Sequence, residues 1–149
     1  MLLDWRFTWI RCAKKNSGPG AAIRVASLNA LPDDGIPRKF PVIAAKVDAW
    51  NKFPQVPVGA VYLVRKGGKV SALNVVCPHA GCFVDYKADR QCYLCPCHNS
   101  TFAVDGRIND KNSPSPRDMD PLEVQVRGTE IWVEFQNFEA GKHERIPVT

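Results

Sequence analysis

The stretches CPHAGC, residues 77–82, and CPCHNS, residues 95–100, dominate this sequence. Together these two boxes hold four of the six cysteines and two of the three histidines of the 149-residue chain. Box 1 reads Cys77-x-His79 and box 2 reads Cys95-x-x-His98. Because thiolate and imidazole are metal ligands, their concentration in two short, similar loops predicts a metal centre that both boxes build together.

Three kinds of chemistry compete for these residues. A structural zinc site usually pairs cysteines in one knuckle and histidines in another, whereas each box here is mixed. The one knuckle-like pair, Cys92-x-x-Cys95, leaves the other cysteines unexplained. Disulfides alone do not explain the histidine that closely follows each Cys-Pro step. A [2Fe–2S] cluster with two thiolates on one iron and two imidazoles on the other takes one ligand of each kind from each box, and the residues favour this interpretation.

The two boxes resemble the cluster-binding motifs of Rieske iron–sulfur proteins. The resemblance is specific over residues 77–102 and looser over about 23–137. It implies that Cys77 and Cys95 hold an inner iron through their sulfurs. It also implies that His79 and His98 hold an outer iron through their imidazoles. The remaining pair, Cys82 and Cys97, would form a disulfide between the boxes. The disulfide is typical of the cytochrome bc-type and other high-potential members, whereas low-potential Rieske ferredoxins lack it.

Residues beside the boxes indicate how strongly the cluster attracts electrons. Ser100 matches a family serine that donates a hydrogen bond to the cluster, which favours the reduced state. Phe102 stands where the bc-type pattern usually has a tyrosine, so we expect a lower potential than in tyrosine-bearing relatives. The loop around Pro114 resembles the proline-containing loop that covers the cluster. Ala80 and Asn99 depart from the usual leucine and glycine of quinol-oxidising relatives.

The two histidines also have a predicted role in proton transfer. A ligating imidazole keeps its second nitrogen at the surface, where His79 and His98 can accept a hydrogen bond and a proton from a quinol. Oxidised iron makes such an imidazole more acidic, so uptake of the proton and of the electron is coupled. We therefore expect a reduction potential that falls with rising pH in the alkaline range.

The rest of the chain predicts an all-β fold, a Rieske-like antiparallel β-sandwich of hairpins with an inserted two-loop cluster-binding subdomain. Gly67-Gly68 between two β-rich runs predicts a tight hairpin. The proline-rich residues 48–57 predict an irregular surface excursion, and Cys92 is expected to be buried in a strand. Strands are expected over residues 23–28, 39–45, 60–66, 69–76, 91–94, 101–104, 107–108, 122–127 and 130–137.

Three segments are expected along the chain. We expect residues 1–20, which include Cys12, to form an N-terminal tail and linker. Their apolar run is too short to span a membrane, and they lack a signal-peptide pattern. Residues 21–140 predict the Rieske domain, with the cluster-binding subdomain at about 77–116. Residues 141–149 predict a C-terminal tail. Either a partner subunit supplies membrane attachment or the chain begins downstream of an anchor.

The predicted function is one-electron transfer as the iron–sulfur subunit of a quinol–cytochrome c reductase-like complex, rather than stand-alone catalysis. A soluble Rieske ferredoxin and the small subunit of another oxidoreductase, such as an arsenite oxidase, are the alternatives. A fold whose cluster is structural or absent also stays open. An oxygenase subunit is excluded for this chain, because a mononuclear iron needs two further histidines and only His143 is left.

The expected partners are cytochrome b-like and cytochrome c-like subunits or carriers, with quinol as a possible substrate. We expect a bacterial, membrane-associated protein, held through its partner subunits, with the cluster domain on the periplasmic side. The formal net charge of +5 comes from residues spread along the chain. Because no long basic run with interleaved aromatic residues appears, nucleic-acid binding is not expected.

Overall fold

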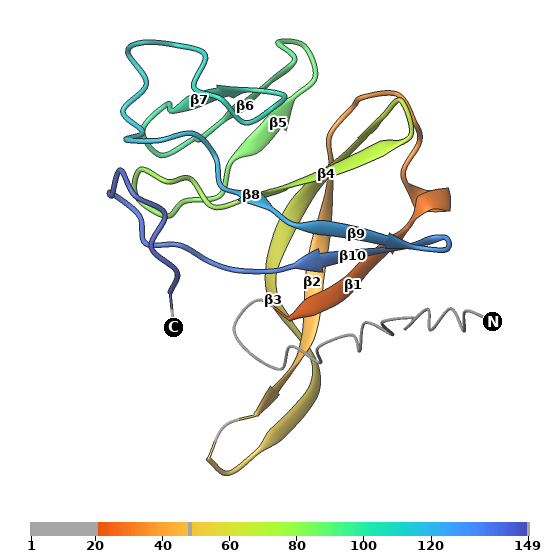
Figure 1. The fold of residues 1–149 in the computed structure, drawn as a ribbon. Coiled ribbons are helices and arrows are strands. Elements are labelled where there is room, and N and C mark those ends of the chain that lie inside the picture. The colour runs from red at the N-terminus through yellow and green to blue at the C-terminus, as the bar shows by residue number, and fades with distance from the viewer. Residues whose placement is uncertain (1–20, 48, 149) are drawn as a thin grey trace, which may run out of the picture.

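The computed structural model describes residues 21–47 and 49–148, which form three antiparallel sheets (Figure 1). The predicted tail and linker of residues 1–20, with Cys12, lie outside these residues. The first sheet has the order β1-β10-β9, the second β2-β3-β4-β8 and the third β5-β6-β7. The only helix in the described ranges is the 3-10 turn Leu28–Ala30, so the predicted all-β, antiparallel fold is confirmed. The strands are β1 Ala22–Ser27, β2 Arg38–Val47, β3 Lys52–Lys66, β4 Lys69–Asn74, β5 Asp85–Lys87, β6 Cys92–Leu94, β7 Thr101–Ala103, β8 Pro121–Leu122, β9 Val124–Arg127 and β10 Glu130–Glu134.

The hairpin between β3 and β4 forms as the sequence predicts. Lys66 pairs with Lys69, and Gly67 and Gly68 make the two-residue turn between them. Both glycines have positive φ values, 59° and 77°, which a primed two-residue turn requires and which glycine adopts without steric cost. This turn fixes the register of the strand that leads into box 1.

The proline-rich stretch 48–57 is an excursion, but the prediction that it lacks regular structure is wrong. From Lys52 the chain is already in β3, which pairs with β2 from Val47 back to Arg38 and projects from the body as a long two-stranded arm (Figure 1). β4 pairs only with residues 61–66 of β3. A strand that pairs on one side only tolerates proline. The N–H groups on its open side make no hydrogen bonds within the sheet, so proline, which lacks an N–H group, costs little there.

Two hydrophobic cores share strand β3. Val61 and Leu63 point into the core between the first two sheets, whereas Tyr62 points into a second core beneath the boxes. This alternation follows from the two-residue period of a strand. The buried members of the first core are Ala26, Leu31, Val42, Val61, Leu63, Ala72, Leu122, Ile131 and Val133. Those of the second core are Tyr62, Leu73, Val75, Cys77, Val84, Tyr93, Cys95, Phe102 and Met119.

The predicted closing hairpin is divided between two sheets. Leu122 belongs to β8 and pairs with Ala72 of β4, whereas the hairpin proper joins β9 to β10 from Val124 onward. The single strand predicted over 122–127 is therefore wrong at Glu123, where the chain changes sheets. Leu122 pairs with β4 and not within the hairpin, because its side chain is buried in the first core.

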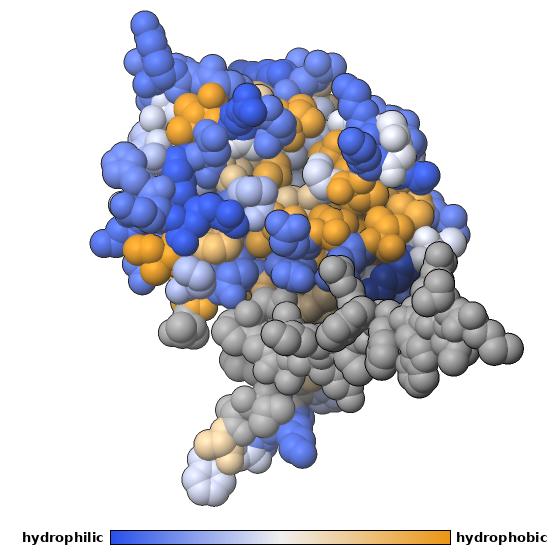
Figure 2. Space-filling view, viewed as in Figure 1, coloured by the Kyte–Doolittle hydropathy of each residue, from blue (hydrophilic) through white to orange (hydrophobic). Residues whose placement is uncertain are grey.

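The chain after β10 returns toward the boxes (Figure 1). In residues 141–149, which are expected to form a C-terminal tail, Pro147 makes a β-bridge with Phe138, and residues 141–145 make hydrogen bonds with earlier loops. On the face shown in Figure 2, hydrophilic side chains predominate around the upper-left loops, and apolar ones gather over the first sheet, where Val126 is exposed. Across the described residues, no helix is both long and apolar enough to span a membrane.

Candidate metal centre

The two boxes have the same backbone geometry. In box 1 the N–H of Cys77 donates to the carbonyl of Cys82 (2.7 Å), and the N–H of Gly81 donates back to Cys77 (3.0 Å). In box 2 the N–H of Cys95 donates to the carbonyl of Ser100 (2.8 Å), and the N–H of Asn99 donates back to Cys95 (3.0 Å). The mirrored composition of the boxes is thus a repeated loop conformation.

The repeat explains one departure from the family pattern. Gly81 and Asn99 occupy the same position of their loops, and both have positive φ, 85° and 59°. Asparagine is among the few non-glycine residues that enter this region readily. Asn99 therefore preserves the turn of box 2 where the family commonly has glycine.

The predicted sulfur ligands lie on the inner side of the boxes. Cys77 and Cys95 are 0% and 1% exposed, and neither is in a disulfide. Burial raises the pKa of the Cys77 thiol, while the backbone N–H of His79 favours its thiolate and opposes the rise. A cationic metal centre stabilises a coordinating thiolate in such a buried place.

The predicted imidazole ligands lie side by side. The rings of His79 and His98 meet edge to face, with their centroids 4.7 Å apart and an angle of 89° between planes. The Nδ1 atom of His79 is buried and makes no hydrogen bond with the described residues. The His98 side chain is exposed. A buried ring nitrogen without a partner has the character of a ligand, because burial of an unsatisfied polar atom is otherwise unfavourable.

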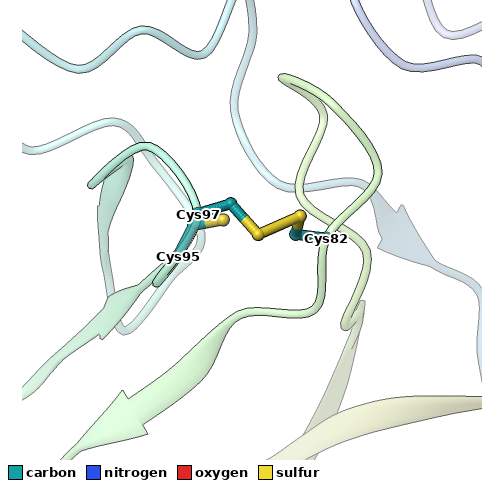
Figure 3. A group of neighbouring side chains, drawn as sticks. All are labelled: Cys82, Cys95 and Cys97. Atoms are coloured by element: carbon teal, nitrogen blue, oxygen red, sulfur yellow. A yellow bond between two sulfur atoms is a disulfide. The ribbon is translucent and has the colours of Figure 1, made fainter.

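A disulfide joins the boxes between Cys82 and Cys97, with Cα atoms 6.6 Å apart (Figure 3). This is the pairing that the family resemblance implies. The sulfurs of Cys82, Cys95 and Cys97 lie within 4.8 Å of one another. Since two of them are bonded together, only Cys95 of this group offers a free thiolate. The disulfide therefore lies close to the sulfur of one predicted ligand.

The zinc knuckle Cys92-x-x-Cys95 does not form. Cys92 is buried in β6 as a free cysteine, which confirms the prediction of a buried strand residue. In the part of the chain that the structure describes, its sulfur belongs to no group of three or more side chains close enough to share a metal ion. Cys92 is therefore a buried residue of β6 without a ligand role.

Residues next to the ligands are placed as follows. Ser100 is 0% exposed, and its hydroxyl makes no hydrogen bond with the described residues. Phe102 is also fully buried and pairs with Tyr93 across β6 and β7. Pro114 is exposed in its loop, while Ser115 is buried and donates from its hydroxyl to the carbonyl of Arg117 (2.7 Å). The predicted role of Pro114 stays a prediction.

Asn74 supports box 1 and was not singled out by the sequence. It is buried at the end of β4, where its Oδ1 accepts from the N–H of Val76 (3.0 Å) and its Nδ2 donates to the carbonyl of Gln136 (2.8 Å). An asparagine that interrupts the apolar run SALNVV is a usable signal, because a buried amide needs partners. Its partner 62 residues away left no local trace.

The residues present fit an iron–sulfur cluster. Two buried free thiols and two adjoining imidazoles lie where the two boxes meet, and the described residues offer no hydrogen-bond partner to the His79 Nδ1 atom or to the Ser100 hydroxyl. Mixed sulfur and nitrogen donors of this kind suit a Rieske centre. Fold and site together define a small iron–sulfur protein.

Comparison with known proteins gives the family. The family model described as Rieske [2Fe-2S] domain matches residues 42–127, which is more than half of the chain. The chain therefore belongs to the Rieske family, its cofactor is a Rieske-type [2Fe–2S] cluster, and it transfers single electrons through that cluster.

Two curated relatives align over most of the chain. One is the cytochrome b6-f complex iron-sulfur subunit of Chlorobaculum thiosulfatiphilum, 32% identical over 125 residues, covering 76% of this chain and 67% of the relative. The other is the menaquinol:cytochrome c reductase iron-sulfur subunit of Bacillus subtilis (strain 168), 27% identical over 116 residues, covering 76% of this chain and 66% of the relative. The chain thus spans about two thirds of the length of these relatives.

A solved structure has the same fold. The cyanobacterial plasma membrane Rieske protein of Synechocystis PCC 6803 superposes with a TM-score of 0.52 and is 27% identical, covering 76% of this chain and 99% of that one. The β-strand framework and its inserted boxes therefore follow the family architecture.

Proposed function

We propose that this chain is the iron–sulfur subunit of a quinol–cytochrome c reductase-like complex of the cytochrome bc type. The observation that carries the proposal is the Cys82–Cys97 disulfide beside two buried free thiols. The family resemblance makes this disulfide typical of high-potential members, and the two aligned relatives are named as iron-sulfur subunits of a cytochrome b6-f complex and of a menaquinol:cytochrome c reductase. Cytochrome b-like and cytochrome c-like proteins are its proposed partners.

Four residues are the proposed ligands. Cys77 and Cys95 hold the inner iron, because their sulfurs are buried and free. His79 and His98 hold the outer iron, because their rings adjoin and the Nδ1 of His79 is buried without a hydrogen-bond partner among the described residues. The bound cluster supplies one-electron chemistry. Neutral imidazoles in place of two thiolates leave two fewer negative charges at the site, which raises its reduction potential.

Proton transfer is assigned to the outward imidazole nitrogens. His98 is exposed and His79 is half-buried, so His98 is the more accessible to a quinol hydroxyl. Its outward nitrogen accepts the hydroxyl hydrogen bond and then the proton. The expected sign of the pH effect is a reduction potential that falls as pH rises in the alkaline range, because loss of this proton favours the oxidised centre.

The disulfide also bears on location. Disulfides persist in oxidising compartments and are rare in reducing ones. We place the cluster domain on the periplasmic side of a bacterial membrane, with attachment through partner subunits.

The ligand roles are tested by substitution in the purified full-length chain. Cys95→Ser and His98→Gln are expected to abolish the visible absorbance and the electron paramagnetic resonance (EPR) signal of a reduced Rieske centre. Cys92→Ser is the matched control, because Cys92 is buried close by in sequence yet has no proposed ligand role. Retention of the signal in Cys95→Ser, or its loss in Cys92→Ser, would contradict the assignment.

The complex type is tested by redox titration of the wild-type chain. Rieske centres span about −150 to +300 mV, and quinol chemistry predicts a positive value here. A value near the negative end would instead support the ferredoxin alternative. Reduction of the oxidised protein by a quinol analogue, faster at higher pH, is the expected companion result.

A further inference from the structure

The two boxes share one loop conformation but differ in what supports them from outside. Box 1 contacts the chain that follows β10, through Gly141, whose N–H donates to the carbonyl of Pro78 (2.7 Å). Among the described residues, no backbone hydrogen bond joins box 2 to that chain. We call residues 136–145 the C-terminal bracket. Its contact falls on the peptide group that leads directly into His79.

A second contact ties the bracket to the entry of box 1. The Nδ2 atom of Asn74 donates to the carbonyl of Gln136 (2.8 Å) and to Oδ1 of Asn137 (3.0 Å). On its other side, the same amide accepts from the N–H of Val76 (3.0 Å). The bracket therefore holds box 1 both before Cys77 and after it.

Arg117 fixes the bracket in turn. Its Nη1 donates to the carbonyls of Glu139 (3.0 Å) and Lys142 (2.6 Å), which lie on either side of Gly141. Its Nε and Nη2 donate to the two oxygens of Asp120, at 2.9 Å and 2.8 Å. A bidentate guanidinium–carboxylate pair sets direction as well as distance.

Asp120 completes the support and is buried among cations. Its side chain is 4% exposed, and Arg145 lies 3.3 Å from Oδ1 as a second positive partner. The main-chain carbonyl of Asp120 also accepts from the N–H of Asn74 (2.9 Å). The ion pair, the bracket and the entry of box 1 thus form one connected set of hydrogen bonds.

We propose that Arg117 and Gly141 are positioning residues for His79, and that the bracket holds this imidazole rigidly while His98 keeps greater freedom. The proposal rests on the proposed ligand role of His79. Gly141 has a φ of 74°, and a Cβ built on it would lie 3.6 Å from the carbonyl of His79. The backbone on both sides of the His79 Cα therefore faces the bracket.

The structure supplies a matched pair of substitutions. Gly141→Ala places a side chain at a positive φ within the bracket, whereas Gly128→Ala does the same in the β9–β10 turn, where φ is 62° and nothing lies within 4 Å. Both substitutions carry a similar backbone strain. Only the first alters a residue that contacts box 1. Arg117→Gln is a second bracket variant that leaves glycine geometry untouched.

The experiment measures amide hydrogen exchange and EPR spectra of the cluster-loaded full-length chain. In Gly141→Ala and Arg117→Gln, the amides of Cys77 and Gly81 are expected to exchange about fivefold faster, the effect of weakening one hydrogen bond. The equivalent amides of box 2, Cys95 and Asn99, should keep the wild-type rate. The EPR g-values and the midpoint potential should shift in both variants and stay unchanged in Gly128→Ala.

Two results would overturn the proposal. One is an equal acceleration of both boxes, which marks general destabilisation. The other is a box 1 exchange rate and an EPR spectrum that match those of Gly128→Ala. Failure of the proposed function is a separate outcome, because it is a wild-type potential near the negative end of the Rieske range, and the exchange comparison still decides the role of the bracket.

Discussion

The buried hydroxyl of Ser100 is expected to raise the reduction potential, and Ser100→Ala to lower it by about 40 mV. Ser100 is fully buried beside a proposed ligand, and its hydroxyl lacks a partner among the described residues. A hydrogen bond contributes about 0.5–1.5 kcal/mol with a neutral acceptor and about 1.5–3 kcal/mol with a charged one. Reduction adds one negative charge, so the bond strengthens by about 1 kcal/mol, or about 40 mV at 59 mV per tenfold change.

Redox titration followed by EPR measures this shift. Ser71→Ala is the control, because Ser71 is exposed on β4. A second measurement has the opposite sign. In the protein stripped of its cluster, an unsatisfied buried hydroxyl costs about 1–3 kcal/mol, so Ser100→Ala should leave the urea unfolding midpoint unchanged or raise it.

A Ser100→Ala protein with an unchanged or higher potential would refute the reasoning. A fall of about 1 kcal/mol in the free energy of unfolding of the cluster-free Ser100→Ala protein would also refute it. The hydroxyl would then have a hydrogen-bond partner within the protein.

Three further predictions concern residues around the core and the surface. Phe102→Tyr should raise the midpoint potential by some tens of millivolts, since it adds a donor to the buried core beside the cluster; an unchanged or lower value in the titration would contradict this. Gly59→Ala should lower the free energy of unfolding by about 1–3 kcal/mol, because its Cβ would collide with the Phe135 ring. Phe135→Leu in the same chain should restore most of that loss in urea unfolding, and no rescue would mean that the collision is not the cause. Hydrogen bonds from Arg38 lower the pKa of Asp34 to about 2. This pair therefore contributes stability above the ordinary pKa of 3.8, and the contribution is lost as pH falls through about 2. An NMR titration should show the Asp34 midpoint move toward 3.8 in Arg38→Gln, and a midpoint near 3.8 in the wild type would refute the ion pair.

Local signals in the sequence predicted the parts of the fold that depend on neighbours in the chain. Gly67-Gly68 marks its hairpin because only glycine takes both positive φ values freely. The two boxes are recognisable because each box contains its two predicted ligands within six consecutive residues. The disulfide between Cys82 and Cys97 followed from the family resemblance, and the structure has it.

Features that depend on distant partners could not be predicted in this way. The strand from Lys52 exists because β2 pairs with it, and two prolines in the segment concealed it. The change of sheet at Glu123 depends on the pairing of Leu122 with Ala72 of β4, which is distant in the sequence. Arg117 contacts carbonyls 22 and 25 residues later, and nothing in its own surroundings distinguishes it from a surface arginine.

The division of β3 between two cores has a consequence for modularity. The core under the boxes includes Tyr62, Leu73 and Met119, which all lie outside residues 77–116. Tyr62 also accepts the N–H of Tyr86 (3.0 Å) and donates to the carbonyl of Val84 (3.2 Å). An excised segment of residues 77–116 would thus lose part of its hydrophobic core. The cluster-binding subdomain is therefore not expected to fold when it is transplanted alone. Any graft onto another scaffold has to carry the β3–β4 hairpin with it.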